Sequence, residues 1–337
     1  MTATVSIIVN NFNYERFVSD AIESALAQTW PDVEVIVVDD GSTDSSRSII
    51  DNYAPRVRTI FKNNGGQASA LNAGYEAAAG EVIMFLDADD ILHVDAATHA
   101  ARQFSGNAAL ARIQWPLEIV DIDAAPSGRL TPNPRMMRSG DLRSHIVKYR
   151  THVWSPTSGN AYADGVLQKV MPVPSEFSFG ADLYLAEMTA LYGTVLSCRE
   201  SYSSYRVHGG NNWTSAQLGV ANIHQRINWT VADHEHVRRA CKELGVDCPV
   251  DVRSALDVAF LSQRLASLRL DRQQHPVAGD RVLAVVRRAL WAAIRHPHHT
   301  RLHKAKRVAW LIGVGFGPAA VSRRLIERFY FPAVNRG

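Results

Sequence analysis

Short apolar runs and amphipathic segments alternate through the first ninety residues, and this alternation constrains the fold more than any other feature of the sequence. The apolar runs have the length and composition of strands that are buried on both faces of a sheet. They cover residues 5–10, 33–38, 57–61 and 81–86, and helical spacing covers residues 17–28, 44–53 and 67–79 between them. We expect the last of these helices to end with Gly80 as its C-cap. Strands and helices that alternate with short links predict an α/β fold, in which helices cover both faces of a parallel sheet.

The rest of the chain divides into a mixed region and a helical one. A strand is expected over residues 111–120, and the proline-rich stretch 126–134 predicts a surface loop. A turn-rich break at residues 209–211 precedes a pattern that is almost wholly helical. The sequence therefore predicts two domains, 1–213 and 214–337, the second of them a helical extension.

Three of the four expected strands end in polar residues. Their ends read Asn-Asn-Phe-Asn at 10–13, Asp-Asp-Gly-Ser at 39–42 and Asp-Ala-Asp-Asp at 87–90. One such end is often a helix cap, but the carboxyl ends of parallel strands share one edge, which is where α/β sheets bind ligands. We therefore expect a polar ligand site at this edge.

The acidic end of the fourth strand is the sharpest of these signals. If the backbone stays extended, Asp87 and Asp89 project to the same side, with Ala88 turned away. Two adjacent carboxylates are costly without a neutralising cation, and oxygen ligands select hard divalent ions such as Mg²⁺ or Mn²⁺. The alternative is a solvated acidic turn, because Asp-x-Asp is a weak motif on its own.

The sequence argues against several other classes of protein. The first strand is not followed by Gly-x-Gly-x-x-Gly, which argues against a dinucleotide-dependent oxidoreductase, and the Walker A motif is absent. Three cysteines without a Cys-x-x-Cys pair argue against a disulfide framework or a zinc site, and they fit a cytoplasmic protein.

Several stretches together resemble the family 2 glycosyltransferases. They are VSIIVNNFNY from Val5, AIESALAQTW from Ala21, EVIVVDDGSTD from Glu34, NGGQASALNAG from Asn64 and GEVIMFLDADD from Gly80. The stretches follow the family's order and spacing, and the resemblance covers roughly residues 4–213. It implies a GT-A fold, a nucleotide-diphosphate-sugar donor, a divalent metal and inversion at the anomeric carbon.

The resemblance also assigns a donor site. It implies donor contacts for Asn10, Phe12, Asp39, Asp40, Gly66, Asp87 and Gly159. Phe12 replaces the tyrosine of many relatives and offers a ring for stacking, with core packing as its alternative. One carboxylate of the Asp39–Asp40 pair would read the base and ribose, while the other would cap the turn that follows. Leu71 replaces an arginine of other members, so that the metal would carry more of the diphosphate charge.

Two later motifs supply the remaining functional residues. The segment Tyr205-Arg-Val-His-Gly-Gly-Asn resembles the family's closing motif, which makes His208 the expected third metal ligand beside Asp87 and Asp89. The segment Phe179-Gly-Ala-Asp-Leu resembles the region of the family's general base, which makes Asp182 the expected catalytic base, with a helix cap as its alternative. Asp182 would remove the acceptor proton as the acceptor oxygen attacks in one inverting displacement.

Charge is distributed unevenly along the chain. The net charge is +3, but residues 281–337 contain twelve Lys or Arg and one acid, which gives this tail +11 and leaves −8 for the first 280 residues. Basic residues flank apolar runs here, which predicts a tail that associates with the surface of a membrane, on its cytoplasmic face. The alternative is a helical appendage that packs on the catalytic domain or another subunit. Nucleic acid is a poorer partner, because no binding motif is present.

Two other functions compete with glycosyl transfer, and the family and the tail bear on the acceptor. Cell-envelope glycan assembly, with a glycan or lipid-linked acceptor, is expected from the family and the tail. A nucleotidyltransferase would share the sheet and the metal, but it needs a glycine- and arginine-rich phosphate loop where residues 10–14 stand. A non-catalytic scaffold that binds nucleotide sugars would not need Asp87, Asp89, Asp182 and His208 together.

Overall fold

The structure is a computed structural model that describes residues 3–149, 152–178, 180–209, 219–249, 251–295 and 300–330. The chain forms two compact units. The N-terminal unit comprises Met1–Ser144 and His152–His208, and the helical unit comprises His145–Thr151 and Gly209–Gly337. The expected boundary between residues 213 and 214 lies outside the described residues.

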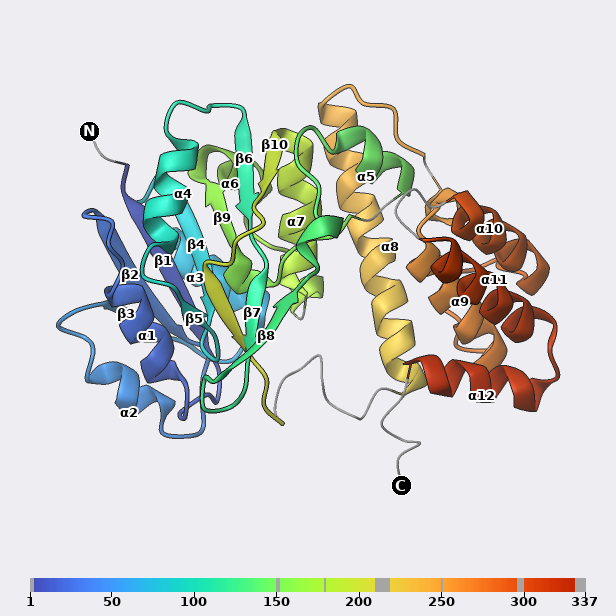
Figure 1. Ribbon diagram of the computed structural model, residues 1–337, viewed down its shortest axis with the longest axis horizontal. Coiled ribbons are helices and arrows are strands. Elements are labelled where there is room, and N and C mark those ends of the chain that lie inside the picture. Colours follow the sequence, from blue (N-terminus) through green and yellow to red (C-terminus); the bar gives the residue numbers. More distant parts are fainter. Residues whose placement is uncertain are drawn as a thin grey trace. The chain divides into compact units, whose positions relative to one another are not determined.

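A seven-stranded sheet forms the centre of the N-terminal unit, in the order β10-β6-β9-β4-β1-β2-β3 (Figure 1). Its strands are β1 (Val5–Asn11), β2 (Val33–Asp39), β3 (Arg58–Phe61), β4 (Val82–Asp87), β6 (Leu110–Gln114), β9 (Asn160–Ala163) and β10 (Thr194–Ser197). β1 pairs in parallel with β2 and β4, and β2 pairs in parallel with β3. Among these strands β9 alone runs against its neighbours, β4 and β6. The four expected strands are therefore present and parallel, and the sheet is mostly parallel.

Helices cover both faces of this sheet. α1 (Val18–Leu26) and α4 (Ala96–Phe104) share one core with the odd-numbered residues of β1. α3 (Gln67–Ala77) packs on the opposite face, where a Cβ on Gly74 would come within 2.2 Å of the Ile8 Cγ2 atom. Because successive strand residues enter different cores, both sets must be apolar, which explains the unbroken apolar runs.

Four further α-helices and three 3-10 turns are described between residues 46 and 192. They are α2 (Ser46–Asp51), α5 (Arg143–Tyr149), α6 (Asp164–Val170) and α7 (Ala181–Tyr192), with the 3-10 turns η1 (Pro134–Met136), η2 (Thr157–Gly159) and η3 (Ser175–Phe177). The expected C-cap role of Gly80 was wrong, because α3 ends at Ala77 and Ala78 continues in an extended conformation. Gly80 instead lies against Ser6, whose backbone nitrogen would be 2.6 Å from a Cβ at this position.

A second, four-stranded sheet has the order β5-β11-β7-β8. Its strands are β5 (Ile91–Leu92), β11 (Ser203–Arg206), β7 (Leu117–Val120) and β8 (Pro126–Thr131). The loop expected over 126–134 was therefore wrong for residues 126–131, because these form β8, which pairs antiparallel with β7. Pro126 stands at the start of this exposed edge strand, where a missing N–H is tolerated. The strand expected over 111–120 is split between β6 and β7, which belong to different sheets.

The helical unit has a core of its own. Its elements are α8 (Val220–Glu243), the 3-10 turn η4 (Val252–Ser254), α9 (Val258–Leu270), α10 (Val282–Arg295), α11 (Arg301–Phe316) and α12 (Ala319–Tyr330). Aliphatic residues of the α-helices described in this unit meet in one apolar cluster, with α9 contributing most of its length. The helical extension expected from the sequence is thus confirmed. None of the described helices combines the length and the apolar character needed to cross a membrane.

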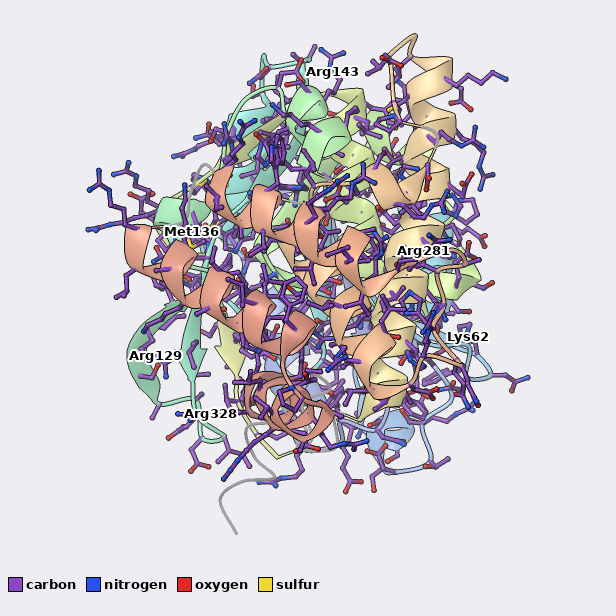
Figure 2. The ribbon with its side chains drawn as sticks, turned by 90° about the vertical axis from the view of Figure 1, so that its right-hand side faces the viewer. Lys62, Arg129, Met136, Arg143, Arg281 and Arg328 are labelled. Atoms are coloured by element: carbon purple, nitrogen blue, oxygen red, sulfur yellow. The ribbon has the colours of Figure 1, made fainter. Side chains whose placement is uncertain are left out.

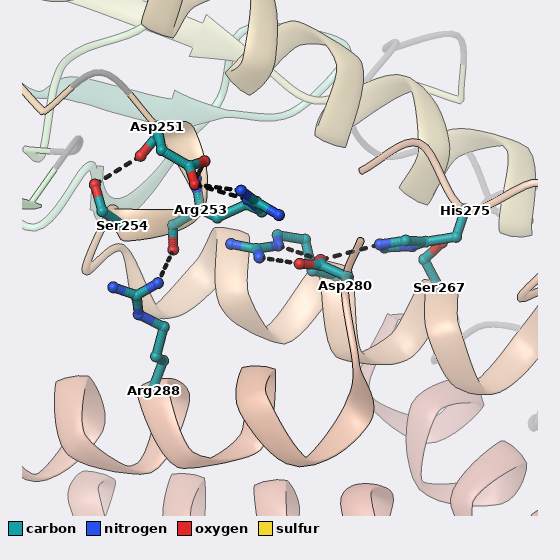
Figure 3. Close-up of polar contacts among 8 residues, drawn as sticks. Asp251, Arg253, Ser254, Ser267, His275, Asp280 and Arg288 are labelled. Carbon is teal, nitrogen blue, oxygen red and sulfur yellow. Dashed lines mark hydrogen bonds and ion pairs between the residues drawn. The ribbon is translucent and has the colours of Figure 1, made fainter. Parts of the chain in front are cut away.

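A buried ion pair lies within the helical unit (Figure 3). The Arg264 guanidinium on α9 donates hydrogen bonds to both carboxylate oxygens of Asp280, and the two side chains are only 2% and 4% exposed. His275 joins them, with its Nε2 atom 3.1 Å from the Asp280 Oδ2 atom and its Nδ1 atom 2.8 Å from the Ser267 Oγ atom. Burial raises the pKa of Asp280, but hydrogen bonds from His275 and Arg264 outweigh it and hold the pKa below its ordinary value.

Candidate active site

Asn10 and Asp87 are register partners at the carboxyl ends of β1 and β4. The Asn10 Nδ2 atom donates a hydrogen bond to the Asp87 Oδ1 atom over 2.9 Å. Gln67, the first residue of α3, donates to the same oxygen over 3.2 Å and to the Thr157 Oγ1 atom over 3.1 Å. The Asp87 carboxylate thus joins β1, β4 and α3, and Gln67 links it to η2, at the edge where the sequence predicts a ligand site.

The backbone turns directly after Asp87. β4 ends at this residue, and the Asp90 amide donates to the Asp87 carbonyl oxygen over 3.0 Å. The expectation that Asp87 and Asp89 project from one side of an extended strand was therefore wrong, because this hydrogen bond closes a turn. Ala88 has no exposed surface, so the turn still directs it into the core.

The turn at residues 87–90, called here the acidic turn, carries three neighbouring carboxyl groups. Burial, and next the Asp89 charge, raise the pKa of Asp87 to about 7. Burial and the charges of Asp89 and Asp87 also raise the pKa of Asp90 well above its ordinary value. Nearby like charges at a poorly solvated position favour the protonated form. The acidic turn is therefore a place where a cation would be strongly stabilised.

Asp90 and Arg206 hold the acidic turn in place. The Ser158 hydroxyl donates to the Asp90 Oδ2 atom over 2.6 Å, and the Arg206 amide donates to the Asp90 Oδ1 atom over 3.2 Å. The Arg206 guanidinium donates to the carbonyl oxygen of Asp89 over 3.2 Å and to the Asp20 carboxylate over 2.7 Å. These contacts fix the backbone of the turn from β11 and η2.

His208 reaches the acidic turn from the end of β11. Its Nε2 atom lies 3.1 Å from the Asp89 Oδ2 atom, and both side chains are nearly buried. The imidazole packs against the ring of Phe17, with 4.7 Å between ring centroids, and against the edge of Tyr14 at 5.7 Å. Burial and the Asp89 charge raise the pKa of Tyr14, whose hydroxyl also hydrogen bonds to Asp89.

Two of the three expected metal ligands therefore come together. Asp89 and His208 are in contact, whereas the Asp87 Oδ1 atom accepts hydrogen bonds from Asn10 and Gln67. Within the described part of the chain, no group of three His, Cys, Asp or Glu residues is arranged to hold a metal ion.

Asp39 and Asp40 both have structural partners. The Asp39 carboxylate accepts hydrogen bonds from the Asn11 side chain over 2.8 Å and from the Ser42 amide over 3.2 Å, so that it caps the turn after β2. The Asp40 carboxylate accepts the Gly65 and Gly66 amides over 3.1 and 2.7 Å and pairs with Lys62. Of the two roles left open by the sequence, the turn cap therefore falls to Asp39.

Gly66 occupies a position that only glycine adopts easily. Its φ of +82° is left-handed, and a Cβ there would come within 3.0 Å of the Ser178 carbonyl oxygen. The next amide, that of Gln67, donates to the same Ser178 oxygen over 2.9 Å. The Asp40 and Ser178 contacts together fix residues 65 and 66, called here the glycine loop, at the start of α3.

Phe12 and Gly159 differ in exposure. The Phe12 side chain is 43% exposed at the end of β1, which rules out the core-packing alternative for its ring. Gly159 is buried, and a Cβ there would lie 2.2 Å from the Ser155 hydroxyl oxygen and 2.7 Å from the Trp115 carbonyl oxygen. Close packing alone therefore requires a glycine at residue 159.

Asp182 lies in the first turn of α7. The Leu183 amide donates to its Oδ1 atom over 2.9 Å, while Gly180 occupies the N-cap position. Burial raises the pKa of Asp182, although the Leu183 amide and the Trp154 side chain hydrogen bond to its carboxylate. Its charge contributes to the raised pKa of Asp87, so the two carboxylates lie within electrostatic reach of each other.

Several residues of this site were not identified from the sequence. Gln67, Tyr14, Asp90, Ser158 and Arg206 all contact the acidic turn or its carboxylates. Tyr14, Gln67, Asp90 and Arg206 stand within the motifs that carry the family resemblance, which was the available signal.

A mostly parallel sheet, covered by helices and carrying an acidic turn at its carboxyl edge, is the arrangement expected of the GT-A glycosyltransferase class. The family model for "Glycosyl transferase family 2" matches residues 6–153. An uncharacterized glycosyltransferase of Nostoc sp., alr2836, is 38% identical over 243 residues, which cover 66% of this chain and 74% of that protein. The chondroitin synthase of Pasteurella multocida is 33% identical over 166 residues, which cover 46% of this chain but 17% of that protein.

Solved structures share the fold. S. aureus TarS 1-349 in complex with UDP-GlcNAc superimposes with a TM-score of 0.59 at 17% identity, covering 97% of this chain and 91% of that one. The mannosyltransferase PcManGT from Pyrobaculum calidifontis, in complex with GDP-Man and Mn²⁺, has a TM-score of 0.53 at 16% identity, covering 99% and 87%. The chain belongs to glycosyltransferase family 2 and has the GT-A fold.

Proposed function

We propose that this chain transfers a sugar from a nucleotide-diphosphate donor to an acceptor hydroxyl, with inversion at the anomeric carbon. The observation that carries the proposal is the grouping of Asn10, Gln67 and Asp87 beside the contact of Asp89 with His208 at the carboxyl edge of the sheet. Ligands of open α/β sheets bind at this edge. The nucleotide sugars in the TarS and PcManGT structures support such a donor.

The donor would contact residues from several elements of the N-terminal unit. The proposed donor-binding residues are Asn10, Phe12, Asp39, Asp40, Gly66, Asp87 and Gly159. The exposed ring of Phe12 offers a stacking surface for a base. Asp40 orders the glycine loop, whose lack of side chains allows a ligand to approach the backbone. Asp39 and Gly159 would act through the backbone that they shape.

We further propose that the site takes Mg²⁺ or Mn²⁺, held by Asp89 and His208 together with Asp87. The residues fit such an ion, because carboxylate oxygens and imidazole are its usual ligands. Burial and the Asp89 charge raise the pKa of Asp87 to about 7, so this carboxylate needs a nearby cation to remain ionised below that pH. A divalent cation bound here would stabilise the negative charge of the departing diphosphate.

Asp182 would act as the general base. Burial raises the pKa of its carboxylate, which makes it a better proton acceptor than an exposed aspartate. Hydrogen bonds from the Leu183 amide and the Trp154 side chain orient it. Asp182 would hold the acceptor proton while the acceptor oxygen displaces the diphosphate, so no covalent intermediate is needed.

We infer that the acceptor is a growing glycan or a lipid-linked saccharide of the cell envelope. The chondroitin synthase and the hyaluronan synthase of Pasteurella multocida, whose names identify them as makers of polysaccharides, are each 33% identical over 166 residues. We assign the transfer to residues 1–213 and treat 214–337 as a helical domain.

The donor site is tested by the melting temperature of the chain with a panel of nucleotide diphosphates, each with and without Mn²⁺. A ligand that binds only the folded chain raises the melting temperature. We expect stabilisation by one diphosphate, dependent on Mn²⁺ and lost in Asp89→Ala. Asp51→Ala, on the exposed side of α2, is the matched control and should retain the response.

Incubation with the matching nucleotide sugar then tests catalysis. Release of the nucleoside diphosphate by the wild-type chain, without release by Asp182→Asn, would support a transferase. Binding without any release, even with saccharide acceptors, would favour the scaffold alternative. Stabilisation by no diphosphate at all would contradict the proposed donor site.

A further inference from the structure

The outer face of α10 carries large apolar side chains that the core does not use. Leu283, Trp291 and Ile294 are 66%, 42% and 58% exposed, and at 100° per residue they share one side of the helix. The opposite side is buried through Val285, Ala289 and neighbouring small residues, and it belongs to the core of the helical unit. The exposed apolar side chains therefore form a second apolar face.

α11 has the same arrangement. Leu302, Ile312 and Phe316 are 64%, 46% and 60% exposed and share one side of the helix, while Leu311 and Val314 fill the core on the other side. α10 and α11 pack against each other within the helical unit, and Figure 2 shows them side by side, with Arg281 at the start of α10. Their outer faces thus form one surface, called here the α10–α11 surface.

Positive charge surrounds these apolar side chains. Arg287 lies in the exposed apolar stripe of α10 and Lys306 borders that of α11, and both side chains are exposed. Arg281, Arg288, Arg295 and Arg301 are exposed at the flanks and ends of the two helices. Neither α10 nor α11 contains an Asp or Glu. The Arg295 guanidinium lies 4.6 Å from the centroid of the Trp291 ring, so charge and apolar surface are interleaved.

We propose that the α10–α11 surface docks onto a bilayer of anionic lipids. Leu, Ile, Phe and Trp side chains beside Arg and Lys are what an interfacial helix needs, because the apolar groups enter the acyl boundary while the cations remain at the phosphate level. The absence of Asp and Glu from α10 and α11 suits a partner whose surface is negatively charged throughout, such as an anionic leaflet. Docking would hold the chain beside lipid-linked saccharides, although the inference does not depend on the proposed transfer.

Sedimentation of the full chain with lipid vesicles tests this inference. We expect binding to vesicles of phosphatidylcholine mixed with phosphatidylglycerol, little binding to phosphatidylcholine alone, and weaker binding at high salt. Two double variants separate the contributions of charge and of apolar insertion to vesicle binding. Arg287→Glu with Lys306→Glu tests charge, and Trp291→Ser with Phe316→Ser tests apolar insertion. Each should weaken vesicle binding by about tenfold or more.

Matched variants of the N-terminal unit serve as controls. Arg102→Glu with Arg199→Glu reverses two exposed arginines there, and Leu130→Ser removes an exposed apolar side chain of β8. These should bind vesicles like the wild-type chain, and the melting temperatures of all variants should be similar because each altered side chain is exposed. No binding to anionic vesicles by the folded chain, or equal loss in the control variants, would overturn the proposal. A dimer that the surface variants convert to a monomer, with no vesicle binding, would instead assign this surface to a second copy of the chain.

Discussion

The Nε2 atom of His208 lies 3.1 Å from the Oδ2 atom of Asp89, although 119 positions separate the two residues in the sequence. The contact forms because β11 brings His208 beside the turn that follows β4. An imidazole and a carboxylate held in this way can become two ligands of one cation, with only small movements of side chains.

Removing the imidazole tests this pair. We expect His208→Ala to bind Mn²⁺ at least about tenfold more weakly than the wild type in the presence of the matching nucleoside diphosphate, because one ligand is lost while the fold persists. Isothermal titration calorimetry measures the affinity. His303→Ala, on the exposed face of α11, is the control and should bind Mn²⁺ like the wild type. Unchanged affinity in His208→Ala would exclude His208 as a ligand.

The raised pKa of Asp87 makes stability depend on pH. Its pKa is about 7 in the folded, metal-free chain, against an ordinary value near 4, so ionisation opposes folding. The contribution of Asp87 to stability is fully present below about pH 4 and is lost as the pH rises toward about 7. Urea unfolding at several pH values between 5 and 8 should show a smaller decline for Asp87→Asn than for the wild type. An identical decline would show that Asp87 is not the titrating group.

Substitution of the proposed base should separate binding from transfer. We expect Asp182→Asn to keep the Mn²⁺-dependent stabilisation by the nucleoside diphosphate, because the amide retains the shape of the carboxylate. Transfer should fall by about 10²- to 10⁴-fold, the usual contribution of a general base. The rate of diphosphate release with an acceptor measures this, with Asp51→Asn as the exposed control. Transfer at the wild-type rate would mean that another group accepts the proton.

Gly66 offers a test of the glycine loop. Gly66→Ala must hold a side chain at φ +82° within 3.0 Å of the Ser178 carbonyl oxygen, so we expect a loss of about 1–3 kcal/mol in the free energy of unfolding. Gly165→Ala is the matched control, because Gly165 lies in α6 with no atom near its Cβ position, and alanine there should be neutral or stabilising. Equal effects in the two variants would contradict the assigned strain.

The sheet could be predicted from the sequence because burial on both faces constrains the residues of each strand itself, and not only its distant partners. β1, β2 and β4 are buried on both faces, so each needs an unbroken apolar run, and such runs are visible in the sequence. β9 carries no such signal, because its four residues, Asn160–Ala163, owe their strand conformation to pairing with β4 and β6. Gly80 was misassigned for a related reason. A glycine is needed there because the backbone packs closely against Ser6, which lies 74 residues away.

The site could be predicted only in part. The polar strand ends located Asn10 and Asp87 at one edge, since parallel strands align their ends. Gln67 could not be found in this way, because its two partners lie 20 and 90 residues away and belong to other elements. The division of roles between Asp39 and Asp40 likewise depends on the Gly65–Gly66 amides, which only the fold brings to Asp40.

The helical unit offers a comparison of a buried and an exposed ion pair (Figure 3). Arg264 and Asp280 are 2% and 4% exposed, whereas Arg253 and Asp251 are 45% and 47% exposed. We expect Asp280→Asn to lower the free energy of unfolding by about 3–5 kcal/mol, because it leaves the Arg264 charge buried without its partner. Asp251→Asn should cost much less, because water screens the exposed pair.

Unfolding of these two variants in urea, followed by helical circular dichroism, measures the difference, and its pH dependence gives a second check. The pKa of Asp280 is held low in the folded chain, so its contribution to stability is present above the ordinary value near 4 and disappears as the pH falls through the lower, folded value. The difference in the free energy of unfolding between the wild type and Asp280→Asn should therefore become smaller under acidic conditions. A gap that stays constant down to the lowest pH at which the chain folds would mean that packing, rather than charge, accounts for the loss.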